Sequence, residues 1–246
     1  MKQCERLLAE QLAVDYDCTL DEVMGDQHVF RPWTVREGAR RIGCDGAIFR
    51  AAAYRGKLLV MAEPCMLDWC RQHMKSLDAA WLSEPETLWQ LNTELNRHGQ
   101  HLADAHHHYL PLGLPQLPHR HWPLRWYQQA ELEQFRGDGR FYEALLFDPQ
   151  RPDLLAVCAL DGEKILGMAS VTRNCRKLWE IGVNVTKESQ DCGVASYLTA
   201  LLSERVEQMG AVPTWATAES HIASQRVALK AGFLPVMYEI YSARNG

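Results

Sequence analysis

Hydrophobic and polar residues alternate along several stretches of the second half of the chain, and this alternation predicts strands. In residues 178–185 the apolar side chains occupy every second position, which is the period of a strand with one buried face. Residues 154–160 form a continuous apolar run, and Asp161 and Gly162 supply a hairpin turn before residues 164–171. The predicted strands of this half are 154–160, 164–171, 178–185, 214–217 and 238–241.

Two stretches of the same half follow helical spacing instead. Between Ala195 and Met209 the apolar residues recur three and four positions apart, so one face of this helix is expected to pack on the sheet before Gly210 ends it. Residues 224–231 predict a second helix. The order of elements is therefore strand, hairpin, strand, helix, strand, helix, strand. This order predicts an α/β fold with a mixed sheet and flanking helices.

The first half of the chain has a different order of predicted elements. Its expected elements are residues 4–12, a strand pair at 47–53 and 58–62, and helices at 66–74 and 87–96. A segment rich in histidine and proline follows, from His101 to Pro123, and its four prolines exclude a long helix. We expect this segment to be an ordered connector or a binding loop that contains a domain boundary. The predicted division is an N-terminal α+β domain at 1–118 and a second domain at 119–246.

The composition is that of a globular protein and excludes few functional classes. The 246 residues can form one large or two modest domains, and no apolar stretch approaches the 18 residues of a membrane span. The formal net charge is −5 with acids and bases interspersed, which argues against a nucleic-acid partner and leaves room for a cationic substrate. The eight cysteines include no C-x-x-C pair, and residues 1–6 do not begin a secretory signal. We therefore expect reduced thiols and a cytoplasmic protein without a membrane partner.

The loop from Gln190 to Ala195 carries the clearest chemical signal. Gly193 and the small residue Ala195 stand between the strand at 178–185 and the following helix, so backbone N–H groups of the first helical turn can point at an anion. The loop lacks the lysine of a P-loop and has one glycine where a dinucleotide fingerprint has three. A loop that serves packing alone is the alternative.

What this loop resembles is the acyl-coenzyme A loop of the GNAT N-acetyltransferases, Gln/Arg-x-x-Gly-x-Gly/Ala. Gln190, Gly193 and Ala195 match it position by position, and residues 179–185 resemble the central splayed strand of that family. Residues 221–233 resemble the second motif of the family, in which Asn-x-x-Ala/Ser leads to a helix that ends in Lys-x-Gly-Phe. The resemblance covers residues 120 to 246. The strand pair and the helices of the first half could be a degenerate second copy of the acetyltransferase fold.

The resemblance implies that acetyl-CoA is the co-substrate, held with its pyrophosphate on the loop and its pantetheine on the edge of the central strand. No metal is implied. The implied cofactor-binding residues are Val183, Asn184, Val185, Gln190, Asp191, Cys192, Gly193, Val194, Ala195, Ser196 and Ser224.

Acyl transfer to an amine also needs a base and a route for the proton of the departing thiolate. Glu180 is the first candidate base because family members carry carboxylates at comparable positions, and Glu219 is the second. Both can instead be ordinary charged residues, at a sheet edge and before a helix. His221 replaces the asparagine of the second motif and can act as a base, line the pantetheine channel or cap the helix.

The general acid of many relatives, a tyrosine seven residues after that asparagine, is missing here because the position is Ala228. Ser224, Tyr238 or Tyr241 could replace it, or the thiolate could leave without an acid. Cys192 at a helix start could be nucleophilic, but the resemblance places it away from the thioester.

The six histidines between positions 101 and 121 have no zinc-site spacing, and a solvated or substrate-lining loop is expected there.

The sequence therefore predicts an N-acetyltransferase that acetylates a primary amine, preferably of a small molecule, by direct transfer in a ternary complex. A non-catalytic acyl-CoA sensor and a protein or peptide N-acetyltransferase are the alternatives. The acceptor, the acyl length and the oligomeric state cannot be read from the residues, and a homodimer is left open.

Overall fold

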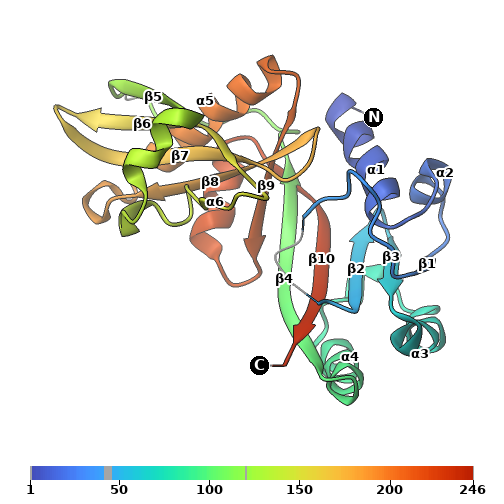
Figure 1. Ribbon diagram of the computed structural model, residues 1–246. Helices are drawn as coiled ribbons and strands as arrows, with labels where there is room; N and C mark the ends of the chain where they lie inside the picture. The colour runs from blue at the N-terminus through green and yellow to red at the C-terminus, as the bar shows by residue number, and fades with distance from the viewer. Residues whose placement is uncertain (1, 42–45, 120, 246) are drawn as a thin grey trace.

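A computed structural model describes residues 2–41, 46–119 and 121–245 of the chain. The described residues form a sheet of ten strands with helices on both faces (Figure 1). Its strand order is β1-β3-β2-β10-β4-β9-β8-β7-β6-β5. This arrangement confirms the mixed α/β fold and the N-terminal α+β part predicted from the sequence.

The elements have the following bounds. The helices are α1 (Gln3–Asp15), α2 (Leu20–Met24), α3 (Pro64–Met74), α4 (Pro85–Arg97), α5 (Val194–Gln208) and α6 (Ile222–Lys230). The strands are β1 (Val29–Pro32), β2 (Phe49–Tyr54), β3 (Lys57–Ala62), β4 (Gln100–Leu110), β5 (Leu124–Gln128), β6 (Asp153–Asp161), β7 (Lys164–Arg173), β8 (Leu178–Val185), β9 (Val212–Ala218) and β10 (Leu234–Arg244). Short 3₁₀ turns are η1 (Ala79–Trp81), η2 (Gln129–Phe135), η3 (Gly139–Phe141) and η4 (Lys187–Ser189).

The helices cover the two faces of the sheet because neighbouring strand residues point in opposite directions. Ala51 of β2 packs in the core formed with α3 and α4, whereas Ala52 packs in the core formed with α1. On β8, Ile181 packs in the core formed with α5 and α6. A fourth core lies under η2 and η3. Both halves of the chain thus have apolar layers on each side of one sheet.

Strands from the two halves of the chain are interleaved at the centre of the sheet. The last strand, β10, pairs antiparallel with β2 on one side and with β4 on the other. β4 in turn pairs antiparallel with β9, so the sheet continues from one half into the other (Figure 1). The hydrogen bonds of the sheet therefore cross the predicted boundary at residues 118 and 119, and the division into two domains stays a prediction.

The expectation of a loop throughout the histidine-rich segment was wrong for its first part. Residues 100–110 form β4, an inner strand of the sheet, and His106, His107 and His108 lie on it. The reason is visible in the sequence, because all four prolines of the segment stand at or after Pro111. Residues 111–119, here called the connector, are irregular as expected. The cysteines of the described part are free thiols, and Cys44 lies outside the described residues.

Candidate functional site

The sheet opens between β8 and β9. The two strands pair in parallel only from Leu178 to Glu180, opposite Val212 to Thr214. Beyond that point β9 pairs with β4, while residues 181–185 of β8 pair with β7 alone among the described residues. Backbone groups on the free side of β8 therefore face the opening, where an extended ligand could bind as a further strand would.

The glycine loop lies between the end of β8 and the start of α5. Gly193 is the N-cap and has a φ of +86°, and Asp191 has a φ of +57°. The N–H of Tyr197 donates to the carbonyl of Gly193 at 3.1 Å, so the N–H groups of residues 194–196 precede the helical hydrogen bonds. The loop thus combines a glycine conformation with a helix N-terminus, and both favour an anion such as pyrophosphate.

The connector reaches this loop, which the sequence did not predict. The N–H of Gly113 donates to the carbonyl of Gly232 at 2.8 Å, and that of Gln116 donates to the carbonyl of Lys230 at 2.7 Å. Two residues further on, Pro118 packs beside Gly193, where a Cβ on the glycine would meet the proline Cγ at 3.1 Å. The connector therefore passes the end of α6 and forms one wall of the loop.

Glu180 lies at the vertex of the opening. It is the last residue of β8 that pairs with β9, opposite Thr214, and its carboxylate accepts a hydrogen bond from the side-chain amide of Asn174. Asn174 stands in the turn between β7 and β8. The side chain is half-buried, so the carboxylate is partly shielded from water.

A second titratable group on the same side of the sheet is His106 of β4. Its Nδ1 lies 2.9 Å from Asp104, which also accepts the hydroxyl hydrogen of Tyr241 at 2.8 Å. The hydrogen bond with Asp104 raises the pKa of His106, and the negative charges of Glu180 and Glu239 act in the same direction. Glu180, His106 and Tyr241 therefore come from three strands and belong to one electrostatic environment.

Comparison with known proteins bears on this geometry. Residues 118–233 match the model of the acetyltransferase (GNAT) family. The C-terminal half of the chain is a GNAT acetyltransferase domain. Members of this family are acyltransferases that use acetyl-CoA, and it is the family that the resemblance of the loop and central strand indicated. No curated protein sequence matches the chain.

Solved structures similar to the chain include GNAT proteins of low sequence identity. A GCN5-related N-acetyltransferase-like protein from Streptococcus suis is 16% identical, with coverage of 65% of this chain and 68% of that one and a TM-score of 0.46. A GNAT-family acetyltransferase from Colwellia psychrerythraea is 14% identical, with coverage of 77% and 78% and a TM-score of 0.44. These scores are low, so the assignment rests on the family match.

Within the GNAT domain, several predicted binding residues have their side chains engaged. Asn184 Oδ1 accepts the N–H groups of Glu143 and Ala144 at 2.9 and 2.8 Å and so fixes the segment after η3. Ser224 Oγ accepts from Trp215 Nε1 at 3.2 Å, and Ser196 Oγ donates to the carbonyl of Gly193 at 3.1 Å. These positions would contribute to a ligand through their backbone groups or through the shape that they impose.

The remaining loop residues are accessible. Gln190, Asp191 and Cys192 are exposed, Val194 is buried in the core, and Ala195 is half-buried. The exposed positions border the free N–H groups of the helix start. Cys192 is thus exposed on the outer side of the loop, and the proposed acyl transfer does not use its thiol.

The other predicted catalytic residues lie elsewhere. The Glu219 carboxylate pairs with the His107 side chain, and the His107 ring lies 5.1 Å from that of Tyr238. Burial raises the pKa of Tyr238 to about 12. His221 Nδ1 accepts the N–H of Ser224 at 3.4 Å, which is the helix-capping alternative considered from the sequence. Ala228 is fully buried.

The histidines of β4 do not converge. His106 contacts Asp104, His107 contacts Glu219, and His108 Nε2 lies 3.3 Å from Glu239. In the described part of the chain no group of three or more histidine, cysteine, aspartate or glutamate residues is placed to hold a metal ion. Across the same residues, none of the helices has the length and apolar character needed to span a membrane.

Glu239 belongs to a buried ion network behind the site. Its carboxylate accepts hydrogen bonds from Arg50 at 2.8 Å, Arg40 at 3.1 Å and the Tyr16 hydroxyl at 2.7 Å. Asp15 pairs with Arg40 as well. Burial opposes ionisation of Glu239, but the two guanidinium groups prevail and hold its pKa well below the ordinary value. The network connects α1, β2 and β10 and fixes Arg40, and the N–H of the neighbouring Arg41 donates to the carbonyl of Asn174 at 3.4 Å.

The sequence missed Asp104, His106 and Asn174. A signal for the first two existed, because Asp104, His106 and His108 occupy alternate positions of a proline-free stretch, which is the spacing of one strand face. Asn174 had no such signal, since its contact with Glu180 depends on the shape of the β7–β8 turn.

Proposed function

We propose that the chain transfers an acetyl group from acetyl-CoA to a primary amine of a small molecule, by direct transfer in a ternary complex. The observation that carries this proposal is the place of Glu180 at the vertex of the β8–β9 opening, with the glycine loop at the other end of the opened strand. A ligand that binds both the N–H groups of 194–196 and the free edge of 181–185 would have its far end directed toward Glu180.

The proposed chemistry begins with the amine. Glu180 takes a proton from the ammonium group, directly or through water, and the neutral nitrogen attacks the thioester carbonyl. The carbon–sulfur bond then breaks and coenzyme A leaves as the thiolate, while the nitrogen gives its second proton to solvent water as the amide forms. Positioning supplies most of the rate, since well-oriented reactants reach effective molarities on the order of 10⁵ M or more.

For the thiolate proton, the position of Tyr241 is the better of the two tyrosines considered. Its hydroxyl donates to Asp104 beside His106, in the electrostatic environment that includes Glu180. Tyr238 instead lies against His107, which adjoins His106 on β4 and therefore points to the other face of the sheet. We propose Tyr241 as the proton donor, with departure of the free thiolate as the alternative.

The first test is calorimetric titration of the full chain with acetyl-CoA, coenzyme A and pantetheine. We expect micromolar binding of acetyl-CoA and coenzyme A that weakens at least tenfold for pantetheine, which lacks the pyrophosphate. Failure of acetyl-CoA to bind at millimolar concentration would remove the proposal.

The second test is thiol release from acetyl-CoA in the presence of primary amines. Glu180→Gln keeps an acceptor for Asn174 and should lower kcat by about 10²–10⁴-fold with little change in acetyl-CoA affinity. Glu163→Gln, in the exposed β6–β7 turn, is the matched control. Binding without turnover on any amine or peptide would favour the sensor, and turnover on peptides alone would favour a peptide acetyltransferase. The cytoplasmic location and a homodimer stay expectations from the sequence.

A further inference from the structure

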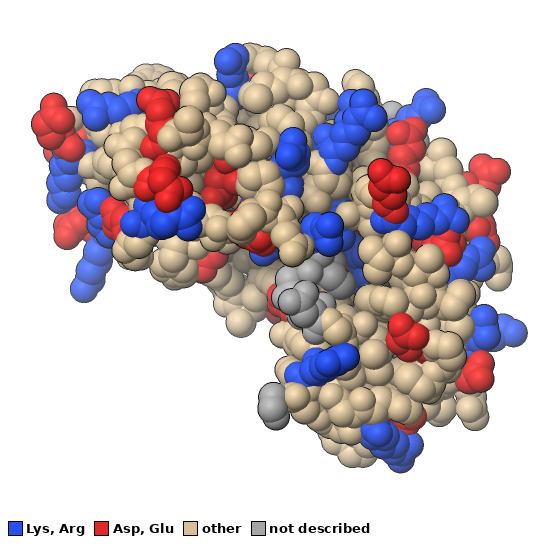
Figure 2. All heavy atoms as spheres, in the orientation of Figure 1, with Lys and Arg blue, Asp and Glu red and all other residues tan. Residues whose placement is uncertain are grey.

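A cavity of about 570 Å³ is lined in part by Asn174, the hydrogen-bond partner of Glu180, and has no role in the proposed reaction as described above. Its walls come from residues 35–41, which precede β2, and from the turn between β7 and β8, with Gln150 at one side. Figure 1 shows these two parts of the chain on the drawn face, and Figure 2 shows lysine and arginine side chains near the middle of that face. We call it the arginine cavity.

Its charge is strongly one-sided. A single carboxylate, Glu37, lines it together with five arginines, which are Arg36, Arg40, Arg41, Arg173 and Arg176. Such an excess stands out on a chain whose formal net charge is −5. Guanidinium groups crowded around one concave surface repel each other, so a bound anion would lower the energy of the site.

Two of the five arginines are neutralised within the protein. Arg40 pairs with Asp15 and Glu239, and Arg36 pairs with Asp17. Arg41, Arg173 and Arg176 make no side-chain hydrogen bond or ion pair with any other residue of the described ranges. Three guanidinium groups are thus available for a ligand, and each offers the fork of donors that matches carboxylate or phosphate oxygens.

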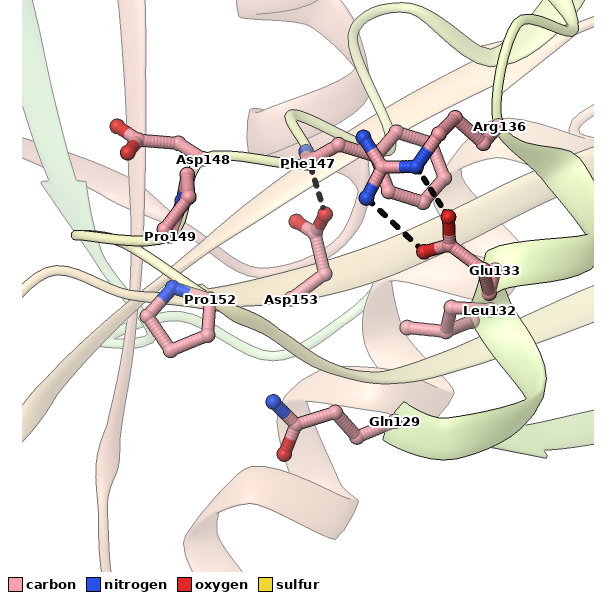
Figure 3. A pocket seen from close by; sticks show the side chains of 9 residues that line it. All are labelled: Gln129, Leu132, Glu133, Arg136, Phe147, Asp148, Pro149, Pro152 and Asp153. Carbon is pink, nitrogen blue, oxygen red and sulfur yellow. Dashed lines mark hydrogen bonds and ion pairs between the residues drawn. The ribbon is translucent and has the colours of Figure 1, made fainter.

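Another cavity in the described part of the chain provides a contrast. It measures about 280 Å³ and lies beside η2, where Figure 3 shows Arg136 paired with Glu133, and Asp153 accepting the N–H of Phe147. Asp148, at its rim, pairs with Arg151. The charged groups of this cavity are paired within the protein, so it has no comparable excess of positive charge that a bound anion would neutralise.

The arginine cavity is joined to the proposed site of acyl transfer. Asn174 lines the cavity and donates a hydrogen bond to Glu180. One residue therefore separates the arginines from the carboxylate that would receive the proton of the amine. A small acceptor could place a cationic amine at Glu180 and an anionic group a few bonds away among Arg41, Arg173 and Arg176.

We infer that the acceptor is a zwitterionic small molecule, a primary amine that also carries a carboxylate or a phosphate, and that the arginine cavity binds its anionic group. This inference rests on the proposed function and names the substrate class of the same site. Both anions share the oxygens that guanidinium groups recognise, and the acceptors tested below distinguish them.

The experiment compares pairs of amines that differ in the anion. The pairs are β-alanine with propylamine and O-phosphoethanolamine with ethylamine, measured as kcat/KM for thiol release from acetyl-CoA. We expect at least one anionic amine to exceed its uncharged partner by tenfold or more. In the Arg173→Gln/Arg176→Gln variant this ratio should fall at least fivefold, through KM, with unchanged acetyl-CoA affinity. Arg97→Gln, on the exposed end of α4, is the control.

A binding measurement separates failure of this inference from failure of the proposed function. β-Alanine and O-phosphoethanolamine are titrated into the full chain without acetyl-CoA and followed by calorimetry. Loss of their binding in the double variant supports the arginine cavity as the anion site even if no amine is acetylated. Equal binding in the wild type and the double variant, or no binding of either compound to the wild type, overturns the inference. A preference for the uncharged amines in turnover overturns it as well.

Discussion

Asn174 donates its side-chain hydrogen bond to Glu180 and thereby joins the β7–β8 turn to the residue at which β8 leaves β9. This contact fixes the position of a half-buried carboxylate at the residue where the sheet opens. It also makes the turn, and not only the strand, part of the environment of the proposed base.

The variant Asn174→Asp tests this relationship. It replaces a hydrogen-bond donor with a like charge at the same position, which disfavours the ionised form of Glu180. We expect the acid limb of the kcat/KM profile to move to higher pH by about one unit. Asn96→Asp, at the exposed end of α4, should leave the profile unchanged. Superimposable profiles for Asn174→Asp and wild type would show that Glu180 is not the base.

Gly193 and Gly210 form a matched pair for the glycine loop. Both have positive φ values, +86° and +79°, but a Cβ at Gly193 meets Pro118 at 3.1 Å while a Cβ at Gly210 meets nothing within 4 Å. Alanine at either position costs about 1–2 kcal/mol of backbone strain. Only Gly193→Ala should weaken acetyl-CoA binding, by about tenfold in calorimetric titration. Equal acetyl-CoA affinities in the two variants would show that the glycine loop is not part of the cofactor site.

Gly182 is a structural requirement of the central strand. A Cβ at this position would lie 1.9 Å from the carbonyl oxygen of Glu143, which is backbone and cannot move aside alone. We expect Gly182→Ala to lower the free energy of unfolding by about 2–3 kcal/mol, in the range of overpacking. Gly139→Ala, in η3, meets nothing within 4 Å and should cost less than about 1 kcal/mol. Urea unfolding measures both, and similar losses would contradict the close approach.

Glu239 determines how the fold responds to acid. Its pKa is lowered well below the ordinary value by Arg40 and Arg50 despite burial, so its contribution to stability is present above about pH 4.5 and is lost as the pH falls toward the lower folded pKa. Glu239→Gln leaves two buried guanidinium groups with less compensation and should cost about 3–5 kcal/mol at pH 7. Glu133→Gln breaks only an exposed pair and should leave the free energy of unfolding nearly unchanged.

The measurement for Glu239 is urea unfolding at pH 7, 4 and 3. The free energy of unfolding should fall less between pH 7 and pH 3 in Glu239→Gln than in the wild type, because the variant has lost the group that takes up a proton. Parallel pH dependences would assign the acid sensitivity to other carboxylates.

The sequence predicted those parts of the fold that depend on local periodicity. β8, α5 and the β6–β7 hairpin follow from spacing alone, and the glycine loop follows from the residues that a helix N-terminus needs. The match of residues 118–233 to the GNAT family confirms the resemblance of these motifs. Local patterns succeed here because each element buries one face against its own neighbours.

The parts that depend on distant pairing were not predicted. The sequence predicts a loop for residues 101–110 because they are grouped with the prolines that follow, yet β4 gains its hydrogen bonds from β9 and β10, more than a hundred residues later in the chain. Asn174 and Arg41 likewise meet at one cavity only after the 35–41 segment packs on the β7–β8 turn. The spacing of apolar residues along the sequence carries no information about such long-range contacts.

The place of β10 between β2 and β4 has a consequence for synthesis. β10 is made more than a hundred residues after β2 and β4, so during translation those two strands have unpaired backbone groups on facing edges until β10 is available. The first half therefore emerges from the ribosome as an incomplete sheet, which is open to wrong pairing until residues 234–244 arrive. Folding of the first half is thus coupled to synthesis of the second.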